Sequence, residues 1–170
     1  THNLVVILNA DTTKYVWEGY FPDLLEKTVT AAASIASYAF ERRYGVGLFS
    51  NGTPLLADRP LKIPSSRDPQ QLPVILEALA TVGPFSSGPL AKMLAQEAVR
   101  FPQGATLAVA TALLPEELVN ALDYLAKRSH KVVVLYVGDD TPPRLSPDVL
   151  LYELGPYLAS LDQSQASHAR

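Results

Sequence analysis

The chain opens with an uninterrupted apolar run that stops abruptly at a cluster of small polar residues. The run covers residues 4–8 and is rich in β-branched side chains, and the sequence Asn-Ala-Asp-Thr-Thr follows it at residues 9–13. A short run without polar interruptions is typical of a strand buried on both faces of a parallel sheet. The polar cluster is therefore predicted to lie at the carboxyl edge of the sheet, where open α/β folds hold their ligands.

An alanine-rich helix is predicted after the polar cluster. Apolar residues recur at spacings of four and three from Leu25 to Ala39, which predicts a helix that opens at Pro22 and ends near Arg42 and Arg43. Because the buried positions are mostly alanine, this helix is expected to lie close to the sheet.

Further strands and helices alternate along the rest of the chain. Strands are predicted over residues 45–50, 61–63, 105–112, 131–137 and 149–154, with a hairpin turn at Asn51-Gly52. Helices are predicted from a cap at Asp68 to a stop at Gly83-Pro84, after a serine loop at residues 86–88, and over residues 115–127. Strands separated by helices require right-handed crossovers. The predicted fold class is therefore α/β, with a doubly wound, mainly parallel and Rossmann-like sheet that carries helices on both faces.

Composition limits the domain organisation and the partners. The chain has 170 residues, of which 48% are hydrophobic, so we expect a single domain over residues 1–162 with a polar tail at residues 163–170. Few residues precede the first strand, which indicates a domain excised from a longer protein. The net charge of -3 comes from interspersed acids and bases, and without a basic stripe no binding to nucleic acid is expected.

The same composition bears on the location of the chain. No apolar run approaches the roughly 20 residues that cross a bilayer, so this segment is expected to make no membrane contact. The chain has no cysteine, which fits a reducing compartment. We therefore expect a soluble, cytoplasmic domain.

No motif in the sequence indicates catalytic chemistry. The first strand is not followed by a glycine-rich phosphate loop. The histidines, His2, His130 and His168, lie at a terminus, a helix-to-strand turn and a tail, so solvated surface positions are predicted for them. Asp139 and Asp140 follow a strand and could pair as acid and base, but the sequence Asp-Asp-Thr-Pro-Pro favours a turn. The chain is therefore predicted not to be an enzyme and to need no cofactor.

The order of these segments resembles a known family. A strand, a polar loop, an alanine-rich helix, the Gly-Val-Gly-Leu-Phe strand, an edge hairpin, the Leu-x-x-Ile-Leu-Glu-Ala-Leu-Ala helix and a serine loop are similar to a von Willebrand factor A-type domain. More narrowly, residues 4–138 resemble the uncharacterised bacterial family called domain of unknown function 58. Members of that family are commonly larger proteins with amino-terminal membrane helices, and they are associated with MoxR-type AAA ATPases. The resemblance thus implies a protein partner of that kind and a membrane-anchored parent protein.

The resemblance also implies a divalent metal site at the carboxyl edge. In A-type domains an Asp-x-Ser-x-Ser loop follows the first strand, and its oxygen atoms suit hard cations such as Mg²⁺. In this chain Asn9 stands where the aspartate is expected, Asp11 where the first serine is expected, and Thr13 where the second is expected. The alternative interpretation is that Asp11 and Thr13 simply cap the backbone of the loop.

The remaining positions of that implied site also depart from the family pattern. Ser87, or its neighbour Ser86, can stand for the hydroxyl of the second loop, but Thr111-Ala112 occupies the usual Ser-Asp. Only the carboxylate of Asp11 remains, and a cation that faces one carboxylate loses most of the attraction that offsets its dehydration. No metal is therefore predicted, and the edge is interpreted as a vestigial metal site.

Aromatic residues crowd the loop between the first strand and its helix. The loop contains Tyr15, Val16, Trp17, Tyr20 and Phe21, and Trp17 is the single tryptophan of the chain. Loops are normally polar, whereas aromatic side chains with a polar tip are enriched at protein contacts. The loop is therefore predicted to be either a partner surface, carried by Tyr15, Trp17 and Tyr20, or a lid that folds back on the helix ends.

Two functional classes follow from these features. The first is a non-enzymatic protein-interaction module with a degenerate metal-site edge, in an ATPase-linked assembly. The second is a small-molecule-binding or hydrolytic Rossmann-like domain that uses Asp11, Ser87, Thr111 and Asp139 around the same crevice. We choose the first, because the sequence lacks a nucleophile-base pair, a phosphate loop and a set of carboxylates for a metal.

Overall fold

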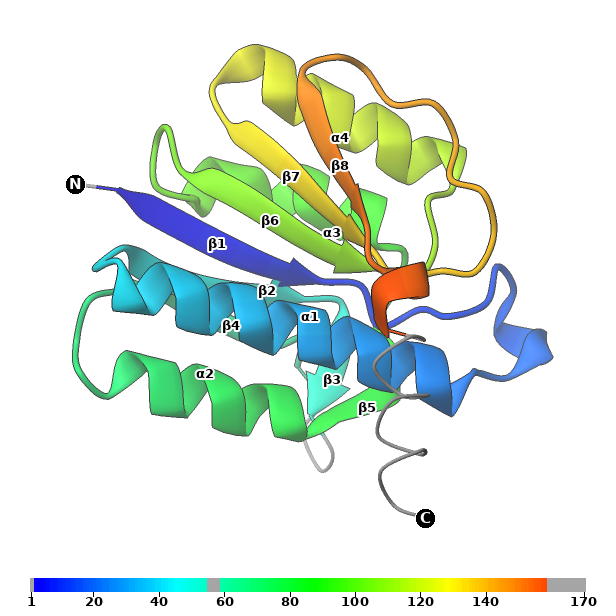
Figure 1. Ribbon diagram of the computed structural model, residues 1–170, viewed down its shortest axis with the longest axis horizontal. Helices are drawn as coiled ribbons and strands as arrows, with labels where there is room; N and C mark the ends of the chain where they lie inside the picture. Colours follow the sequence, from blue (N-terminus) through cyan, green and yellow to red (C-terminus); the bar gives the residue numbers. More distant parts are fainter. Residues whose placement is uncertain (1, 55–58, 159–170) are drawn as a thin grey trace.

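The computed structural model describes residues 2–54 and 59–158, in which a central sheet lies between two layers of helices (Figure 1). The elements in chain order are β1 (Asn3–Leu8), the 3-10 turn η1 (Val16–Glu18), α1 (Pro22–Glu41), β2 (Gly45–Ser50), β3 (Gly52–Pro54), β4 (Lys62–Ser66), α2 (Gln71–Ala80), β5 (Val82–Ser86), α3 (Leu90–Glu97), η2 (Ala98–Arg100), β6 (Thr106–Thr111), α4 (Glu116–Arg128), β7 (Lys131–Tyr136) and β8 (Val149–Glu153). A short helical turn at residues 155–158 follows β8.

The main sheet has six strands in the order β4-β2-β1-β6-β7-β8. Every neighbouring pair in it is parallel except β2 and β4, which are antiparallel. The chain leaves β1 towards β2 on one side and returns to β6 on the other, so the strand order reverses between β1 and β6. The predicted doubly wound, mainly parallel α/β fold is confirmed, and this reversal is the point where such sheets form a crevice at their carboxyl edge.

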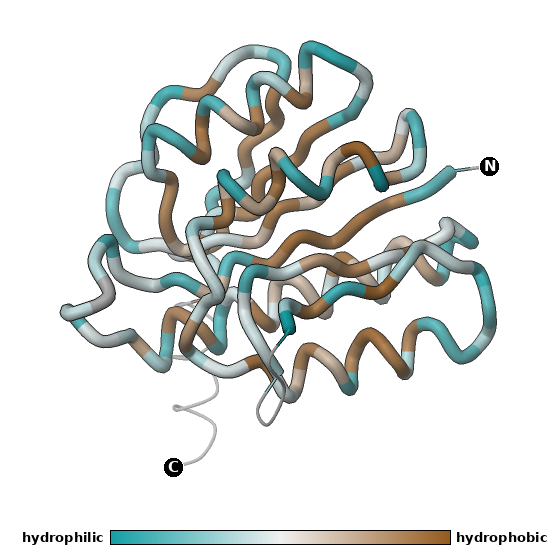
Figure 2. Tube along the Cα trace, turned by 180° about the vertical axis from the view of Figure 1, so that it is seen from behind, coloured by the Kyte–Doolittle hydropathy of each residue, from teal (hydrophilic) through white to brown (hydrophobic). Residues whose placement is uncertain are grey.

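Strand β1 is buried on both faces, as its apolar run predicted. Leu4, Val6 and Leu8 pack on the side of α1 and α2, whereas Val5 and Ile7 pack on the side of α3 and α4. The hydropathy colouring places the apolar segments of the strands in the middle of the molecule (Figure 2). Side chains alternate between the two faces of a strand, so a run without polar residues fits a strand with a helical layer on each side.

Helix α1 fixes the loop that precedes it. It begins at Pro22, which lacks the backbone N–H that a first helical turn leaves unpaired. The N–H of Phe21 donates to Oγ1 of Thr12 at 2.9 Å, which ties the end of the aromatic loop back to the polar cluster after β1. Ala32 and Ala36 are fully buried against the sheet. The helix ends at Glu41, within two residues of the predicted end.

A small second sheet was not predicted. Gly83-Pro84 was expected only to end a helix, but β5 (Val82–Ser86) pairs antiparallel with β3 (Gly52–Pro54). The hairpin-turn interpretation of Asn51-Gly52 is also wrong, because Gly52 is the first residue of β3 and the chain does not reverse there. This second sheet extends the fold beside the carboxyl ends of β1 and β2 (Figure 1).

One local expectation is confirmed and another is corrected by the structure. Helix α2 begins at Gln71, and the carboxylate of Asp68 accepts from the N–H of Gln70 at 2.8 Å, so Asp68 caps the turn that leads into the helix. His130 is buried rather than solvated: its Nδ1 lies 3.0 Å from the carbonyl oxygen of Ala105. The ring joins the α4-β7 turn to the residue before β6, which explains its burial.

The other predictions about the ends of the chain have different outcomes. His2 is exposed as predicted, and its ring stacks on Tyr44 with centroids 5.4 Å apart. His168 and the polar tail lie outside the described residues, and the domain boundary at residue 162 stays a prediction. Among residues 2–54 and 59–158, no helix has both the length and the apolar character needed to cross a membrane.

Candidate functional site

A direct hydrogen bond between side chains joins the carboxyl ends of β1 and β6. The side-chain amide of Asn9, just after β1, donates to Oγ1 of Thr111 at the end of β6 over 3.1 Å. Both side chains are buried. The Thr111 hydroxyl donates in turn to the carbonyl oxygen of Leu113 at 2.5 Å. Asn9 and Thr111, which the sequence placed at one edge, are therefore in contact, and neutral groups occupy the contact.

Asn51 is the centre of the edge, and the sequence interpretation missed it. It follows β2 directly and is fully buried. Its Oδ1 accepts from the N–H of Ala10 at 2.8 Å. Its Nδ2 lies 3.2 Å from Oδ1 of Asn9, 3.3 Å from Oδ2 of Asp11 and 3.0 Å from the carbonyl oxygen of Gly88. One amide thus joins the loop after β1, the end of β2 and the loop after β5.

Ser87 reaches this network through its backbone and not through its hydroxyl. Its N–H donates to the carbonyl oxygen of Asn51 at 2.8 Å, while the residue as a whole is exposed. The sequence predicted that the Ser87 hydroxyl would stand at the second loop of the edge. The structure brings the Ser87 backbone to the edge because the unpredicted strand β5 ends there.

Thr13 shapes the aromatic loop. Its hydroxyl lies 3.1 Å from the carbonyl oxygen of Tyr15 and 2.9 Å from that of Gly19. The N–H of Tyr15 donates to the carboxylate of Glu18 at 3.0 Å, and Gly19 adopts a left-handed φ of 83° that lets the chain turn back towards α1. Thr13 therefore serves the loop backbone, as the capping interpretation predicted for it.

The residues at this edge do not fit a hard divalent cation. Mg²⁺ requires several converging oxygen ligands, but the amide nitrogen of Asn51 occupies the space between the oxygens of Asn9 and Asp11. Oδ1 of Asn9 also accepts from the N–H of Asp11 at 3.1 Å. Within the described ranges, no group of three or more His, Cys, Asp or Glu side chains has a geometry that could hold a metal ion. The edge is built to satisfy hydrogen bonds within the protein.

The aromatic loop is exposed beside this network. Trp17 is 81% exposed, and its ring stacks on Tyr15 with centroids 4.6 Å apart and planes 9° apart. Lys14 lies over the Tyr15 ring, with Nζ 5.3 Å from the ring centroid. A lid would bury its aromatic side chains, whereas these remain open to solvent. The geometry favours the contact-surface interpretation of the loop.

Phe85 extends the aromatic surface across the edge. Its ring is 68% exposed and meets Tyr20 edge-on, with centroids 6.3 Å apart. Phe85 belongs to β5, and because the sequence did not predict this strand, it did not predict the position of Phe85 either. The usable signal in the sequence was an apolar aromatic residue directly before the serine loop, at the same edge as the aromatic loop.

The side chains that the enzyme interpretation requires do not form one hydrogen-bonded group. Thr111 is bonded to Asn9 and Leu113, and Asp11 contacts Asn51. Asp139 is exposed after β7, and no side-chain hydrogen bond among the described residues connects it to Asp11 or Thr111. Asp139 and Asp140 instead act on Tyr136: its burial raises the pKa of the phenol, and the two nearby carboxylates raise that pKa further.

Comparisons with known proteins bear on the fold. The conserved hypothetical protein BatB of Bacteroides thetaiotaomicron is 14% identical, with a TM-score of 0.56 over 99% of each chain. The VWA domain of SpRpn10 is 14% identical, with a TM-score of 0.50 over 94% of this chain and 95% of that one. Proximal thread matrix protein 1 of the mussel byssus is 9% identical, with a TM-score of 0.58 over 95% of this chain and 46% of its own.

No protein-family model matches the chain, and no curated protein matches it. At the identities of the solved structures, the likeness concerns the fold alone. The sheet order, the helical layers on both faces and these neighbours agree. The chain therefore has the von Willebrand factor A-like α/β fold that its sequence predicted.

Proposed function

We propose that this chain is a non-enzymatic protein-interaction module that binds its partner without a metal, through the aromatic loop at the carboxyl edge of the sheet. The observation that carries the proposal is the exposure of Trp17, which is 81% open to solvent. A tryptophan is a costly residue to expose, and buried tryptophan and tyrosine anchors dominate the binding energy of many interfaces.

The hydrogen-bond network of Asn9, Asn51 and Thr111 supports a binding mode that needs no metal. A metal-bound edge contacts its ligand through an open coordination position, whereas here the polar groups are already paired with one another. The network holds the ends of β1, β2 and β6 together. It thus serves as a rigid base for the aromatic loop, which Thr12 and Thr13 tie to the same edge.

The resemblance to domain of unknown function 58 supports a narrower version of this proposal. In that version the chain is the cytoplasmic domain of a larger bacterial protein that is anchored in a membrane. Its partner is a MoxR-type AAA ATPase, and the aromatic loop contacts that ATPase or another member of the same assembly.

The test begins with purification of the natural parent protein and identification of the proteins bound to it. The affinity of the isolated partner for the chain is then measured by calorimetry, with and without a metal chelator. The partner is kept free of nucleotide in both measurements. Trp17→Ala is expected to weaken binding by about 2 kcal/mol or more, which is roughly 30-fold, and the chelator is expected to change nothing.

A matched control is Tyr124→Ala on α4, because Tyr124 is also an exposed aromatic residue, at 53%, but lies on a different element. This variant should bind like the wild type. If Trp17→Ala and Tyr124→Ala bind equally well, or if the chelator abolishes binding, the proposed function is wrong.

A further inference from the structure

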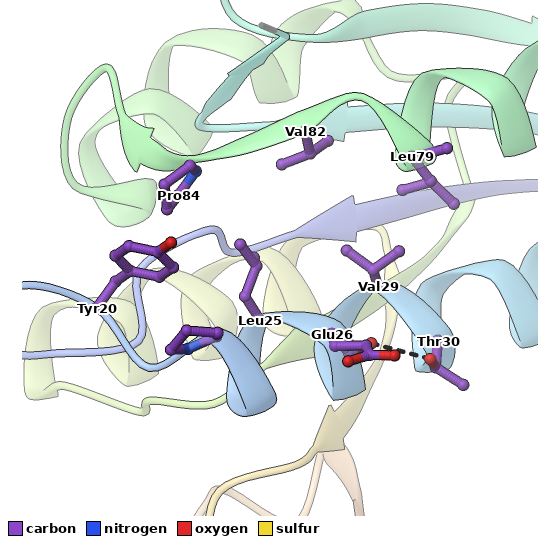
Figure 3. A pocket seen from close by; sticks show the side chains of 10 residues that line it. Tyr20, Leu25, Glu26, Val29, Thr30, Leu79, Val82 and Pro84 are labelled. Atoms are coloured by element: carbon purple, nitrogen blue, oxygen red, sulfur yellow. Dashed lines mark hydrogen bonds between the residues drawn. The ribbon is translucent and has the colours of Figure 1, made fainter.

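An apolar groove lies beside the aromatic loop, between α1 and the segment formed by the end of α2 and β5 (Figure 3). Its volume is about 480 Å³. Leu25 and Val29 of α1 point into it from one side, and Leu79 and Val82 line the other. A groove of this size accommodates a few side chains, so it suits a linear segment better than the flat surface of a folded domain.

The groove is continuous with the aromatic loop. Tyr20, which ends that loop, and Pro84 of β5 face each other at its mouth (Figure 3). Tyr20 also contacts the exposed ring of Phe85 edge-on. The loop and the groove therefore share Tyr20 as a common wall and form one surface, and a partner bound at the loop meets the groove as well.

The charge beside the groove is negative and comes from α1, whereas in the aromatic loop the exposed Lys14 and Glu18 have opposite charges. Residues 79–89, which form the β5 side, include no charged residue. On the α1 side, Asp23 and Glu26 are exposed, and the one nearby base, Lys27, is half-buried. Glu26 lies at the rim, and none of the ion pairs within the described part of the chain involves it. A carboxylate beside an apolar groove favours a ligand with a complementary positive charge.

We propose that this surface binds a linear segment of another protein that is apolar along one face and carries a lysine or arginine opposite Glu26. The inference rests on the proposed function, since it states the chemistry of the partner that the aromatic loop contacts. Apolar side chains of the segment fill the space between Leu25 and Val82, and its basic residue pairs with Glu26. An amphipathic helix presents apolar side chains along one face, at spacings of three and four residues.

The test uses a phage-displayed library of random peptides, selected on the wild-type chain. Selected peptides are expected to combine apolar residues with at least one lysine or arginine. Glu26→Lys should weaken these peptides about tenfold or more, because it replaces attraction by repulsion, and Glu26→Gln should weaken them less. The matched control is Glu41→Lys, an exposed acid at the opposite end of α1, which should leave their affinity unchanged.

The outcomes separate this inference from the proposed function. Peptides that require Trp17 but are unaffected by Glu26→Lys overturn the inference and leave the proposed function standing. If Glu26→Lys weakens the binding of the peptides but Trp17→Ala leaves it unchanged, the result supports the groove. That result counts against the aromatic loop as the binding surface. An absence of enriched peptides, or an enrichment of acidic ones, overturns the inference.

Discussion

The side-chain nitrogen of Asn51 lies 3.2 Å from Oδ1 of Asn9, although the two residues are 42 positions apart in the chain. The family resemblance implies a metal-binding aspartate at the position of Asn9, and in this structure the amide of Asn51 lies beside that position. The amide both donates and accepts within the protein. This contact joins the loop after β1 to the end of β2.

The first prediction concerns the stability that this amide provides. Asn51→Ala leaves the buried N–H of Ala10 without its partner and removes one of the two donors to Oδ1 of Asn9, and an unpaired buried group costs about 1–3 kcal/mol. We expect the free energy of unfolding to fall by roughly 2–4 kcal/mol. Asp11→Ala removes one contact of 3.3 Å from a half-buried carboxylate and should cost at most about 1 kcal/mol.

Urea denaturation of both variants measures this difference. A loss for Asp11→Ala that equals the loss for Asn51→Ala would contradict the central role of the amide.

The second prediction is that the wild-type chain has no specific site for Mg²⁺ or Mn²⁺. Calorimetric titration should detect no saturable submillimolar binding. Asn9→Asp with Ala112→Asp supplies the two missing carboxylates, but the nitrogen of Asn51 still lies beside them. Adding Asn51→Ser to that pair replaces the amide by a hydroxyl oxygen, and this triple variant is expected to bind Mg²⁺ more tightly than the double one. Saturable binding to the wild type that disappears in Asp11→Ala would refute the prediction.

The regular elements of this fold were accessible from sequence because their patterns have one physical explanation. The apolar run of β1 and the Gly-Val-Gly-Leu-Phe-Ser run of β2 are predicted at the residues where the structure has them, apart from Asn3. Strands buried on both faces consist almost entirely of apolar residues, so the pattern is a strong signal. The small buried residues of α1 are equally informative, since a helix that lies close to a sheet needs them.

The missed features depend on contacts between distant segments. Asn51-Gly52 is a common turn sequence, and only the approach of Asn9 and Gly88 turns Asn51 into a buried link between loops. Strand β5 contains a glycine and a proline, which weaken strands locally, and it exists because β3 pairs with it. His130 follows the same logic, because its burial depends on the carbonyl of Ala105. Local pattern carries no information on such partners.

The third prediction tests the central position of β1. Ile7 is completely buried, and Ile7→Ala is expected to lower the free energy of unfolding by about 2–5 kcal/mol. Leu150→Ala on the edge strand β8 is the control, because that side chain is 44% exposed and should cost less than about 1 kcal/mol. Equal losses in chemical denaturation would mean that β1 is not a central strand.

The fourth prediction concerns Trp17, whose emission reports on one site because the chain has a single tryptophan. The fluorescence of the folded protein should be red-shifted and readily quenched by acrylamide, as expected for a ring that is 81% exposed. Trp17→Ala removes the stacking on Tyr15 and should change stability by no more than about 1 kcal/mol. A blue-shifted emission together with a strongly destabilised variant would identify the loop as a lid.

The last prediction concerns alkaline pH. Burial, helped by the charges of Asp140 and Asp139, raises the pKa of Tyr136 above its ordinary value of 10.0. The folded state therefore holds the phenol proton at pH values where the unfolded chain has released it. Its contribution to stability is complete below about pH 10 and is lost as pH rises through the raised pKa.

Chemical denaturation from about pH 9 to about pH 11, on either side of the ordinary tyrosine pKa, checks this sign. Tyr136→Phe should make the alkaline fall in stability shallower, because the variant has no phenol to ionise. The double variant Asp139→Asn with Asp140→Asn should also make the fall smaller, since the pKa of Tyr136 in the folded state then lies closer to its value in the unfolded chain. A wild-type stability that rises across this range, or a Tyr136→Phe profile identical to the wild type, would show that the Tyr136 pKa is not raised by the fold.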